Sequence, residues 1–372
     1  MKLFNIDAHI SVIADVTYIL KELYGDDVDI EEWSISGHCW VFGKKPANVK
    51  YVNGQTWRNF NKEMVDNFVK ENKDFLSKFD GFIVTHTPIF ALLFESFNKP
   101  IIVVNSCRYE QPYSFNENNN LGRWNYLNLK LKQMHDTGQL TVISNNKGDQ
   151  EYLRLGTGIE SILIPSLCLY TNAKYTPIMD TPTGKSLWDL NVVYTDCGLL
   201  KKTDKMVSRQ EFVGFYYSWS NLYSCNSMIH FPYEISTMSI FEQYSANIPL
   251  FFPTKRFLKE LISTNKCKFG SRYIMINNSV KSNKVYPKSL DIAMDDETWI
   301  DFWVDKADYY DEENMKYIVY FDDLVELEQL TKTTNTMDVS ENMRKHNIIR
   351  KDTVYSSWKT VMDNIICMFL QD

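Results

Sequence analysis

The stretch that decides the fold is Met228–Pro253, MIHFPYEISTMSIFEQYSANIPLFFP. It begins with a short apolar run that predicts a buried strand ending at Pro232. The hydroxyl residues of Ser236–Ser239 then predict the start of a helix, because such side chains satisfy the free N–H groups of a first turn. A second apolar run, Pro249–Phe252, predicts the next strand. A strand, a helix and a strand in this order indicate a parallel α/β sheet.

The same alternation runs through most of the chain. In the first half, the predicted strands are Lys2–Ile6, Gly81–Thr85, Pro100–Asn105, Leu140–Ser144 and Ile162–Pro165, and the predicted helices are Val12–Leu23, Phe90–Phe97, Arg123–His135 and Lys147–Leu155. In the second half, we expect strands over Leu190–Thr195 and Met228–Phe231, an edge-like piece over Phe212–Gly214, and helices over Met238–Ala246 and Val354–Phe369. We therefore predict the α/β class.

The length of the chain suggests more than one domain. At roughly one domain per 150 residues, 372 residues predict two domains or one large domain with insertions. Asn172–Lys185 is rich in Pro, Thr and Gly, a composition that favours a linker.

Charge and cysteine usage narrow the class of protein. Lys and Arg number 40 against 47 Asp and Glu, a net charge of −7, which does not favour a partner such as nucleic acid or a membrane surface. The seven cysteines are scattered and form no C-x-x-C pair, which argues against a zinc ribbon and for reduced thiols in a cytoplasmic location. No apolar run reaches about 18 residues, so we expect no transmembrane segment, and Met1–Ser11 suits a first strand better than a signal peptide.

Two carboxylates flank the start of the central helix. Glu234 lies in the loop and Glu242 lies on the helix, so they can reach different parts of one ligand. A carboxylate only accepts hydrogen bonds and therefore suits paired sugar hydroxyls. The helix N-terminus attracts anions such as a diphosphate, and in an open α/β sheet this loop lies where ligands bind. The alternative is an ordinary capped helix with Glu242 on its wet face.

The same stretch resembles the donor-binding segment of retaining GT-B glycosyltransferases. In that family a proline-led loop carries Glu, then seven residues, a second Glu, and a proline-led apolar strand seven positions later. Pro232, Glu234, Glu242 and Pro249 match those spacings. Weaker likenesses lie in Glu211–Gly214 with Leu222–Tyr223, in Asp80–Ser106, in Leu140–Ser166 and in Tyr355–Trp358.

The resemblance implies a fold and a domain division. It implies two Rossmann-like domains with parallel sheets that face a cleft. Residues 1–175 would form an N-terminal acceptor domain, completed by a C-terminal helix over 352–372. Residues 176–351 would form the C-terminal domain that binds the nucleotide-sugar donor.

The resemblance also implies roles for individual residues. Glu242 would bind the ribose hydroxyls, Glu234 would face the donor sugar, and His86 would line the cleft near the reacting centre. The remaining donor contacts would come from Tyr233, Ser236, Thr237, Met238 and Ser239, of which the last four would place backbone N–H groups on the diphosphate. The family prefers Gly at the positions of Ile235 and Thr237, where this chain departs from the pattern.

Other residues are candidates on their position alone. His86 follows a predicted strand at its carboxyl end, and the alternative is a buried histidine bonded to backbone. Asp7 and His9 follow the first strand and suit either an acceptor contact or a turn or cap.

Basic residues supply a further set of candidates. Arg108 suits a phosphate or acceptor carboxylate, or else a surface ion pair. Lys255 and Arg256 suit a diphosphate, or else the start of a solvated helix.

These observations predict a glycosyltransferase that moves a sugar from a nucleoside-diphosphate sugar to a glycan, glycoprotein or other hydroxyl acceptor. The resemblance implies retention of configuration, no metal and no cofactor beyond the sugar donor. The helix N-terminus and nearby cations would stabilise the leaving diphosphate. An inverting route would need a base, for which Asp7, His9 or His86 would serve. The alternatives are another GT-B enzyme, such as a nucleotide-sugar epimerase or a phosphorylase, or a non-catalytic sugar-binding or interaction protein of the same fold.

Overall fold

The computed structural model describes residues 1–113, 121–177, 185–189, 200, 203, 205–214, 216–267, 269–270 and 281–369. The chain divides into two compact units. The first unit comprises Met1–Ser166, Arg272–Asp295 and Val354–Asp372, and the second comprises Leu167–Ser271 and Asp296–Thr353. Across the described residues, no helix has both the length and the apolar character that a membrane crossing requires.

The first unit is built on a parallel sheet whose described strands run in the order β2-β1-β3-β4-β5-β6. The strands are β1 (Lys2–Asp7), β2 (Asp29–Ser34), β3 (Gly81–His86), β4 (Ile101–Asn105), β5 (Leu140–Ser144) and β6 (Ile162–Leu163). β3 and β4 are buried along nearly their whole length, which explains their continuous apolar sequences.

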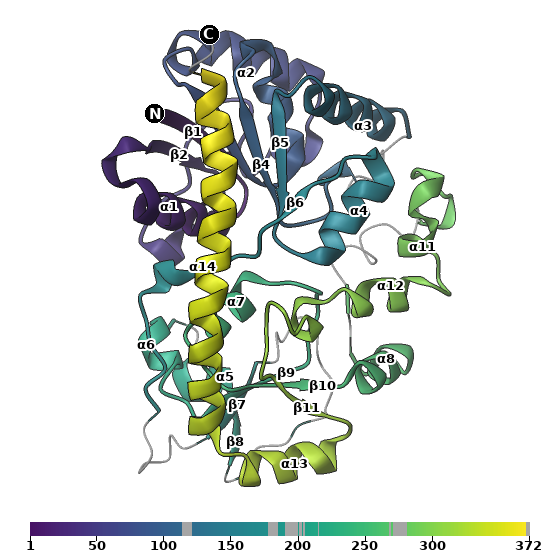
Figure 1. The fold of residues 1–372 in the computed structure, drawn as a ribbon. Coiled ribbons are helices and arrows are strands. Elements are labelled where there is room, and N and C mark those ends of the chain that lie inside the picture. Colours follow the sequence, from purple (N-terminus) through teal and green to yellow (C-terminus); the bar gives the residue numbers. More distant parts are fainter. Residues whose placement is uncertain are drawn as a thin grey trace. The chain divides into compact units, whose positions relative to one another are not determined.

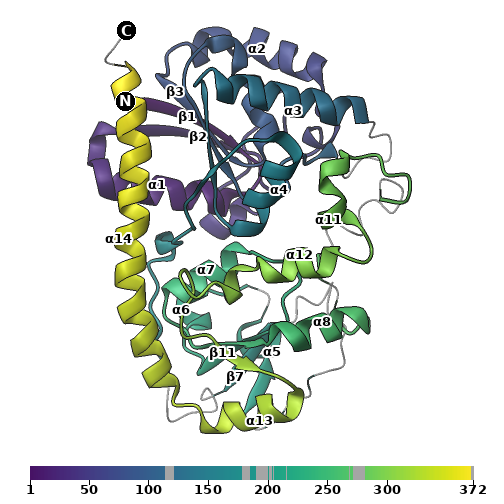
Figure 2. The same cartoon turned by 45° about the vertical axis from the view of Figure 1, so that its right-hand side comes forward.

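Helices cover both faces of this sheet, as Figures 1 and 2 show. One face carries α1 (Ile10–Tyr24) and the end of α14 (Thr336–Phe369), which are joined by a hydrogen bond from Tyr24 Oη to Asp363 Oδ1 of 3.2 Å. The other face carries α2 (Lys62–Leu76), α3 (Leu121–Asp136) and α4 (Lys147–Thr157). The short helix α11 (Asp291–Met294) also belongs to this unit. The core is therefore a two-sided α/β sandwich.

The second unit has its own parallel sheet, with described strands in the order β11-β10-β9-β7-β8. The strands are β7 (Ser186–Asp189), β8 (Met206–Ser208), β9 (Ser227–His230), β10 (Leu250–Pro253) and β11 (Val319–Phe321). The helices are α5 (Arg209–Val213), α6 (Trp219–Leu222), α7 (Met238–Ser245), α8 (Lys255–Ser263), α12 (Trp299–Asp305), α13 (Leu324–Thr333) and the first part of α14. The parallel α/β class predicted from the sequence is confirmed in both units.

Two short segments differ from the sequence-based expectation. Phe212–Gly214 belongs to the end of α5 and not to an edge strand, because Ser208 and Glu211 form a capping box that starts a helix. Phe90–Phe97 lies in two 3₁₀ turns, η4 (Pro88–Leu93) and η5 (Glu95–Phe97), and not in an α-helix. Every residue of η4 is buried, so this connection is too tightly packed to expose a polar helical face.

The last helix and one strand need separate comment. The final helix begins at Thr336, whereas the sequence predicted a start near Val354. The first half of the helix was missed because it is polar and has no apolar stripe that would indicate a helix. Exposed pairs such as Glu341 with Arg344 support that half instead. The strand expected over Leu190–Thr195 lies outside the described residues, and the described strand β7 ends just before it at Asp189.

Candidate functional site

The sheet of the first unit changes direction between β1 and β3. The chain passes from β1 to its neighbour β2 on one side, whereas it passes from β3 to β4 on the other side. Such a switch point leaves a crevice at the carboxyl ends of the two strands, and ligands of open α/β sheets bind there. β1 ends at Asp7, which is paired in register with Thr85, next to His86. The structure therefore brings the candidates Asp7, His9 and His86 to one switch point.

Three histidines gather at this point. His9 is the N-cap residue of α1, and its ring centroid lies 5.6 Å from that of His86. His38 adds a third ring, 6.1 Å from the ring of His9. His86 ends β3 with a left-handed φ of 74°, a conformation that costs free energy for a residue other than glycine. Sequence reasoning missed His38 because β2, the strand that precedes it, has a polar sequence, DIEEWS, and was not predicted.

Asp7 has an unusual environment for a carboxyl group. Its side chain is fully buried at the end of β1, and burial raises its pKa to about 7. The nearby Ser34 side chain and His9 backbone oppose this rise only in part, and the negative charge of Glu32 adds to it; neither carboxylate oxygen of Asp7 has a hydrogen bond of ordinary geometry to the described residues. A carboxyl group with a pKa near neutrality can take up or release a proton at physiological pH.

Arg108 is buried and does not lie at the surface. It is 3% exposed, and its Nη1 lies 3.7 Å from Asp149 Oδ1, on the first turn of α4. Arg108 therefore does form an ion pair, as the alternative predicted, but this ion pair is buried in the first unit and does not lie at the surface. Burial raises the pKa of Asp149 although Arg108 opposes the rise. Breaking such a pair by removing one partner leaves an uncompensated buried charge.

The second unit has its switch point between β7 and β9. β7 is followed by β8 on one side, whereas β9 is followed by β10 on the other side. The loop after β9 carries Glu234, which is 5% exposed. The 3₁₀ turn η9 (Asp308–Tyr310) holds this loop: Tyr309 Oη donates to the Glu234 carbonyl at 3.2 Å, and the Asp308 N–H donates to the Ile235 carbonyl at 3.0 Å. Glu234 thus has the switch-point position expected of a ligand contact, in a buried setting.

The hydroxyl residues at the start of α7 do not cap the helix as expected. Thr237 is the N-cap residue, but its side chain accepts no hydrogen bond from the first turn. Its Oγ1 lies 3.1 Å from Ser239 Oγ instead. Tyr233, Ser236 and Thr237 are half-buried, Met238 is buried and Ser239 is exposed. No N–H group of the first turn of α7 therefore donates to the N-cap side chain, whereas the hydroxyl residues of this segment predict such a bond.

Glu242 holds two aromatic side chains. Its Oε1 accepts a hydrogen bond from Tyr170 Oη at 2.5 Å, and its Oε2 accepts one from Trp219 Nε1 at 3.2 Å. The two rings meet edge to face with centroids 5.8 Å apart. Sequence reasoning missed Tyr170 and Trp219, because they lie 72 and 23 positions away from Glu242.

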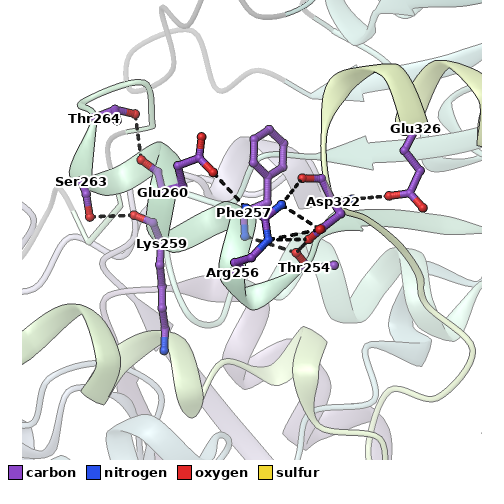
Figure 3. A network of polar contacts seen from close by, with 9 residues as sticks. All are labelled: Thr254, Arg256, Phe257, Lys259, Glu260, Ser263, Thr264, Asp322 and Glu326. Carbon is purple, nitrogen blue, oxygen red and sulfur yellow. Dashed lines mark hydrogen bonds and ion pairs between the residues drawn. The ribbon is translucent and has the colours of Figure 1, made fainter.

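Lys255 and Arg256 begin α8 and are engaged in surface ion pairs. Figure 3 shows Arg256 directed at Asp322, with Arg256 Nε 3.1 Å from both carboxylate oxygens of Asp322 and Arg256 Nη1 3.1 Å from Glu260 Oε2. Lys255 Nζ lies 3.6 Å from Asp305 Oδ1. Both cations are exposed, so the contacts favour the alternative of a solvated helix start. A diphosphate would have to displace these carboxylates.

Within the part of the chain that the structure describes, no group of three or more His, Cys, Asp or Glu side chains is arranged to hold a metal ion.

Comparison with known proteins places the fold. No protein-family model matches the chain, and no curated protein matches it. Among solved structures, Alr3699/HepE from Anabaena in complex with UDP and glucose is 10% identical, with 98% of this chain and 99% of that chain covered and a TM-score of 0.50. The glycosyltransferase SnogD from Streptomyces nogalater is 10% identical over 96% and 99% of the chains, with a TM-score of 0.42. At such identities only the fold is established, and the GT-B fold predicted from the sequence is confirmed.

Proposed function

We propose that this protein is a glycosyltransferase that uses a nucleoside-diphosphate sugar as donor and a hydroxyl group, as in a glycan or glycoprotein, as acceptor. One observation carries the proposal. The candidates Asp7, His9 and His86 lie at the switch point of one sheet, and Glu234 lies at the switch point of the other. In open α/β sheets, residues at the carboxyl ends of the strands beside a switch point lie next to the crevice in which ligands bind.

The fold agrees with a nucleotide-sugar donor. HepE, which has a similar fold, was solved with UDP and glucose bound, and we transfer that ligand class to this chain as part of the proposal. The second unit would bind the donor. Glu242 would accept hydrogen bonds from the ribose hydroxyls, and the Tyr170 and Trp219 rings that it orients would contact the nucleotide.

The reaction makes one bond and breaks one. The acceptor oxygen forms a bond to the anomeric carbon, and the bond from that carbon to the diphosphate oxygen breaks with its electron pair on the diphosphate. The N-terminus of α7, which begins at Met238, would stabilise the charge that develops there. In the retaining course that we propose, the acceptor proton passes to the leaving diphosphate. In an inverting course it would pass to Asp7, His9 or His86.

A ligand screen tests the donor site. We would measure the unfolding temperature with UDP, GDP, ADP and CMP and their sugar conjugates, each with Mg²⁺ and with EDTA. Ligand at about 100 times its Kd adds about 2.7 kcal/mol of stability, which raises the unfolding temperature by a degree or more. We expect one nucleoside diphosphate to act with or without the metal, and Glu242→Gln to remove the shift. The control is Glu328→Gln on α13, whose exposed carboxylate forms an ion pair with Lys332 one turn along the helix.

Turnover tests the reaction itself. With the donor identified, the purified protein is incubated with hydroxyl acceptors and the products are resolved by mass and by anomeric configuration. Transfer with retention supports the full proposal, whereas an inverted product contradicts the retaining course. Isomerisation of the donor without acceptor would indicate an epimerase, and cleavage that requires inorganic phosphate would indicate a phosphorylase. Binding without any turnover would indicate a sugar-binding protein of this fold.

A further inference from the structure

The turn after β3 holds His86 in a strained backbone conformation. The Thr87 N–H donates a hydrogen bond of 3.1 Å to the Thr85 carbonyl, and His86 between them has a φ of 74°. These two observations define a γ-turn of the rare kind that has a positive φ at its centre. Such a conformation costs free energy for residues other than glycine, and it persists only where the surrounding structure enforces it.

The segment that follows β4 supports this turn. The His86 carbonyl accepts two hydrogen bonds from it, one from the Ser106 N–H at 3.3 Å and one from the Cys107 thiol at 3.0 Å. The parallel pairing of β3 with β4 brings the two segments together, because His86 lies in register with Asn105. The carbonyl of the strained residue is therefore held by a backbone donor and by a side-chain donor.

The Cys107 thiol is suited to act as a donor. It is buried, and burial raises its pKa well above the usual range, with a further rise from the negative charges of Asp149 and Glu110. The thiol therefore keeps the proton that it donates. Its sulfur lies 3.0 Å from the His86 carbonyl oxygen and 3.4 Å from that of Arg108, so the His86 carbonyl is the nearer acceptor.

The Thr87 side chain ties the end of the turn to the same segment. Its hydroxyl donates a hydrogen bond of 2.6 Å to the Gln111 carbonyl, and both residues are buried. Cys107 and Thr87 thus anchor the turn at His86 itself and at the residue after it. Both anchors oppose relaxation of His86 to a negative φ.

The place of the His86 ring depends on this backbone. The direction in which a side chain leaves the chain is coupled to the backbone conformation, so relaxation to a negative φ would move the imidazole. The ring now lies beside His9, with the two centroids 5.6 Å apart, at the switch point of the first unit. Glycine would adopt the same turn without strain, so a histidine in this turn, at a ligand-binding edge, favours a role for the imidazole itself.

We propose that Cys107 and Thr87 are positioning residues for His86. They hold its γ-turn and thereby fix the imidazole at the switch point of the first unit. The consequence for turnover rests on the proposed function, with the acceptor bound in the crevice at this switch point. The effect on the His86 ring does not rest on it, so the two effects are measured separately.

Nuclear magnetic resonance of the histidine rings tests the positioning. The chain has six histidines, so the protein labelled with ¹³C-histidine gives six Cε1–H signals, and His86→Gln identifies that of His86. Cys107→Ala is expected to shift the His86 signal and to split or broaden it, whereas Cys107→Ser keeps a donor and should restore a single signal. Thr87→Val is expected to act as Cys107→Ala does. The matched control is Cys225→Ala, which removes a buried thiol of the second unit.

Glycine tests the strain in the turn. His86→Gly is expected to unfold at a higher urea concentration than His86→Ala, because glycine adopts a positive φ without strain. At positions with a negative φ the order is the reverse, because glycine loses more chain entropy on folding. If His86→Ala were the more stable variant, the turn would not be strained at His86 and the proposal would fail.

Turnover tests the consequence for the reaction. With the donor and acceptor identified, Cys107→Ala is expected to lower kcat about tenfold and to leave the KM of the donor unchanged, because a displaced imidazole loses its alignment with the reacting groups. Cys107→Ser should keep most of the activity. In a His86→Gln background, Cys107→Ala should have no further effect, because Cys107 then has no imidazole to position.

Two further results would overturn the proposal. One is a folded Cys107→Ala variant whose His86 signal matches that of the wild type. The other is a loss of kcat in Cys107→Ala that persists in full in the His86→Gln background, because Cys107 would then act by another route. The unfolding temperature shows whether each variant is folded, and if Cys107→Ala is not, Thr87→Val decides by the same signal. If the ring signals respond as expected but no nucleotide sugar is turned over, the positioning stands and the proposed function fails.

Discussion

Replacement of Asp7 by asparagine is expected to stabilise this protein, and the gain should grow with pH. Burial raises the pKa of the Asp7 carboxyl from 3.8 to about 7 in the folded state. Between these values the folded chain holds a proton that the unfolded chain has released. The stability of the wild type therefore falls as the pH rises through this window. Asparagine is neutral throughout this pH range, so it carries no cost of burying a charge.

The size of this effect follows from the pKa difference. The difference between a pKa of 3.8 and a pKa of about 7 corresponds to about 4 kcal/mol, which is the full cost of the buried charge above pH 7. The advantage of Asp7→Asn over the wild type should grow by up to about 1.4 kcal/mol per pH unit between pH 4 and pH 7 and should be constant at higher pH.

Urea unfolding at pH 5, 6, 7 and 8, followed by tryptophan fluorescence, measures this difference. Asp26→Asn is the control, because Asp26 is exposed and its neutralisation removes no cost of burial. A stability difference between Asp7→Asn and the wild type that does not change with pH would refute the reasoning. If His9 or His86 depends on Asp7 during turnover, the same variant should lose activity while it gains stability, a trade that functional sites often show.

Three further predictions concern packing and polar contacts. Gly156→Ala should lower the free energy of urea unfolding by about 1–2 kcal/mol, because the new Cβ would meet the ring of Tyr109. Trp124 Nε1 donates a hydrogen bond of 2.7 Å to Tyr109 Oη and so limits the movement of that ring. The control Gly37→Ala, which has open space around it, should be neutral or slightly stabilising. Glu242→Ala should lower the free energy of unfolding by about 2 kcal/mol, because Tyr170 and Trp219 lose a charged hydrogen-bond acceptor. Glu242→Gln should lower it by less, because the Gln carbonyl can keep one of the two hydrogen bonds, and equal losses would contradict this account. Arg350→Ala should lower the free energy of unfolding by about 3 kcal/mol, because Arg350 is 4% exposed and donates hydrogen bonds to Asn314 at 2.7 Å and to Ser245 at 3.0 Å. The control Arg256→Ala should leave the unfolding midpoint unchanged, because the ion pairs of Arg256 lie at the surface.

The pattern of apolar residues along the chain was sufficient to predict the strands and helices that bury both faces or one apolar stripe. β3, β4 and β5 are continuous apolar runs, and they lie where the sequence predicted them. β2 and the first half of α14 were missed for the opposite reason. The sequence of β2, DIEEWS, has no apolar run, and the polar first half of α14 has no apolar stripe.

For the candidate site too, some features were predictable from the sequence and others depended on the tertiary structure. The sequence by itself determined which residues end strands, because a strand end follows from the apolar run that precedes it. Asp7 and His86 were found by this rule, whereas Glu234 was found in the loop after a predicted strand through its spacing from Glu242. Only the tertiary structure decided that these ends lie at switch points, because strand order depends on long-range pairing that no local pattern encodes. It also decided that Glu242 meets Tyr170 and Trp219, that Arg108 is buried against Asp149, and that burial raises the pKa of Asp7, because each of these depends on residues distant in sequence.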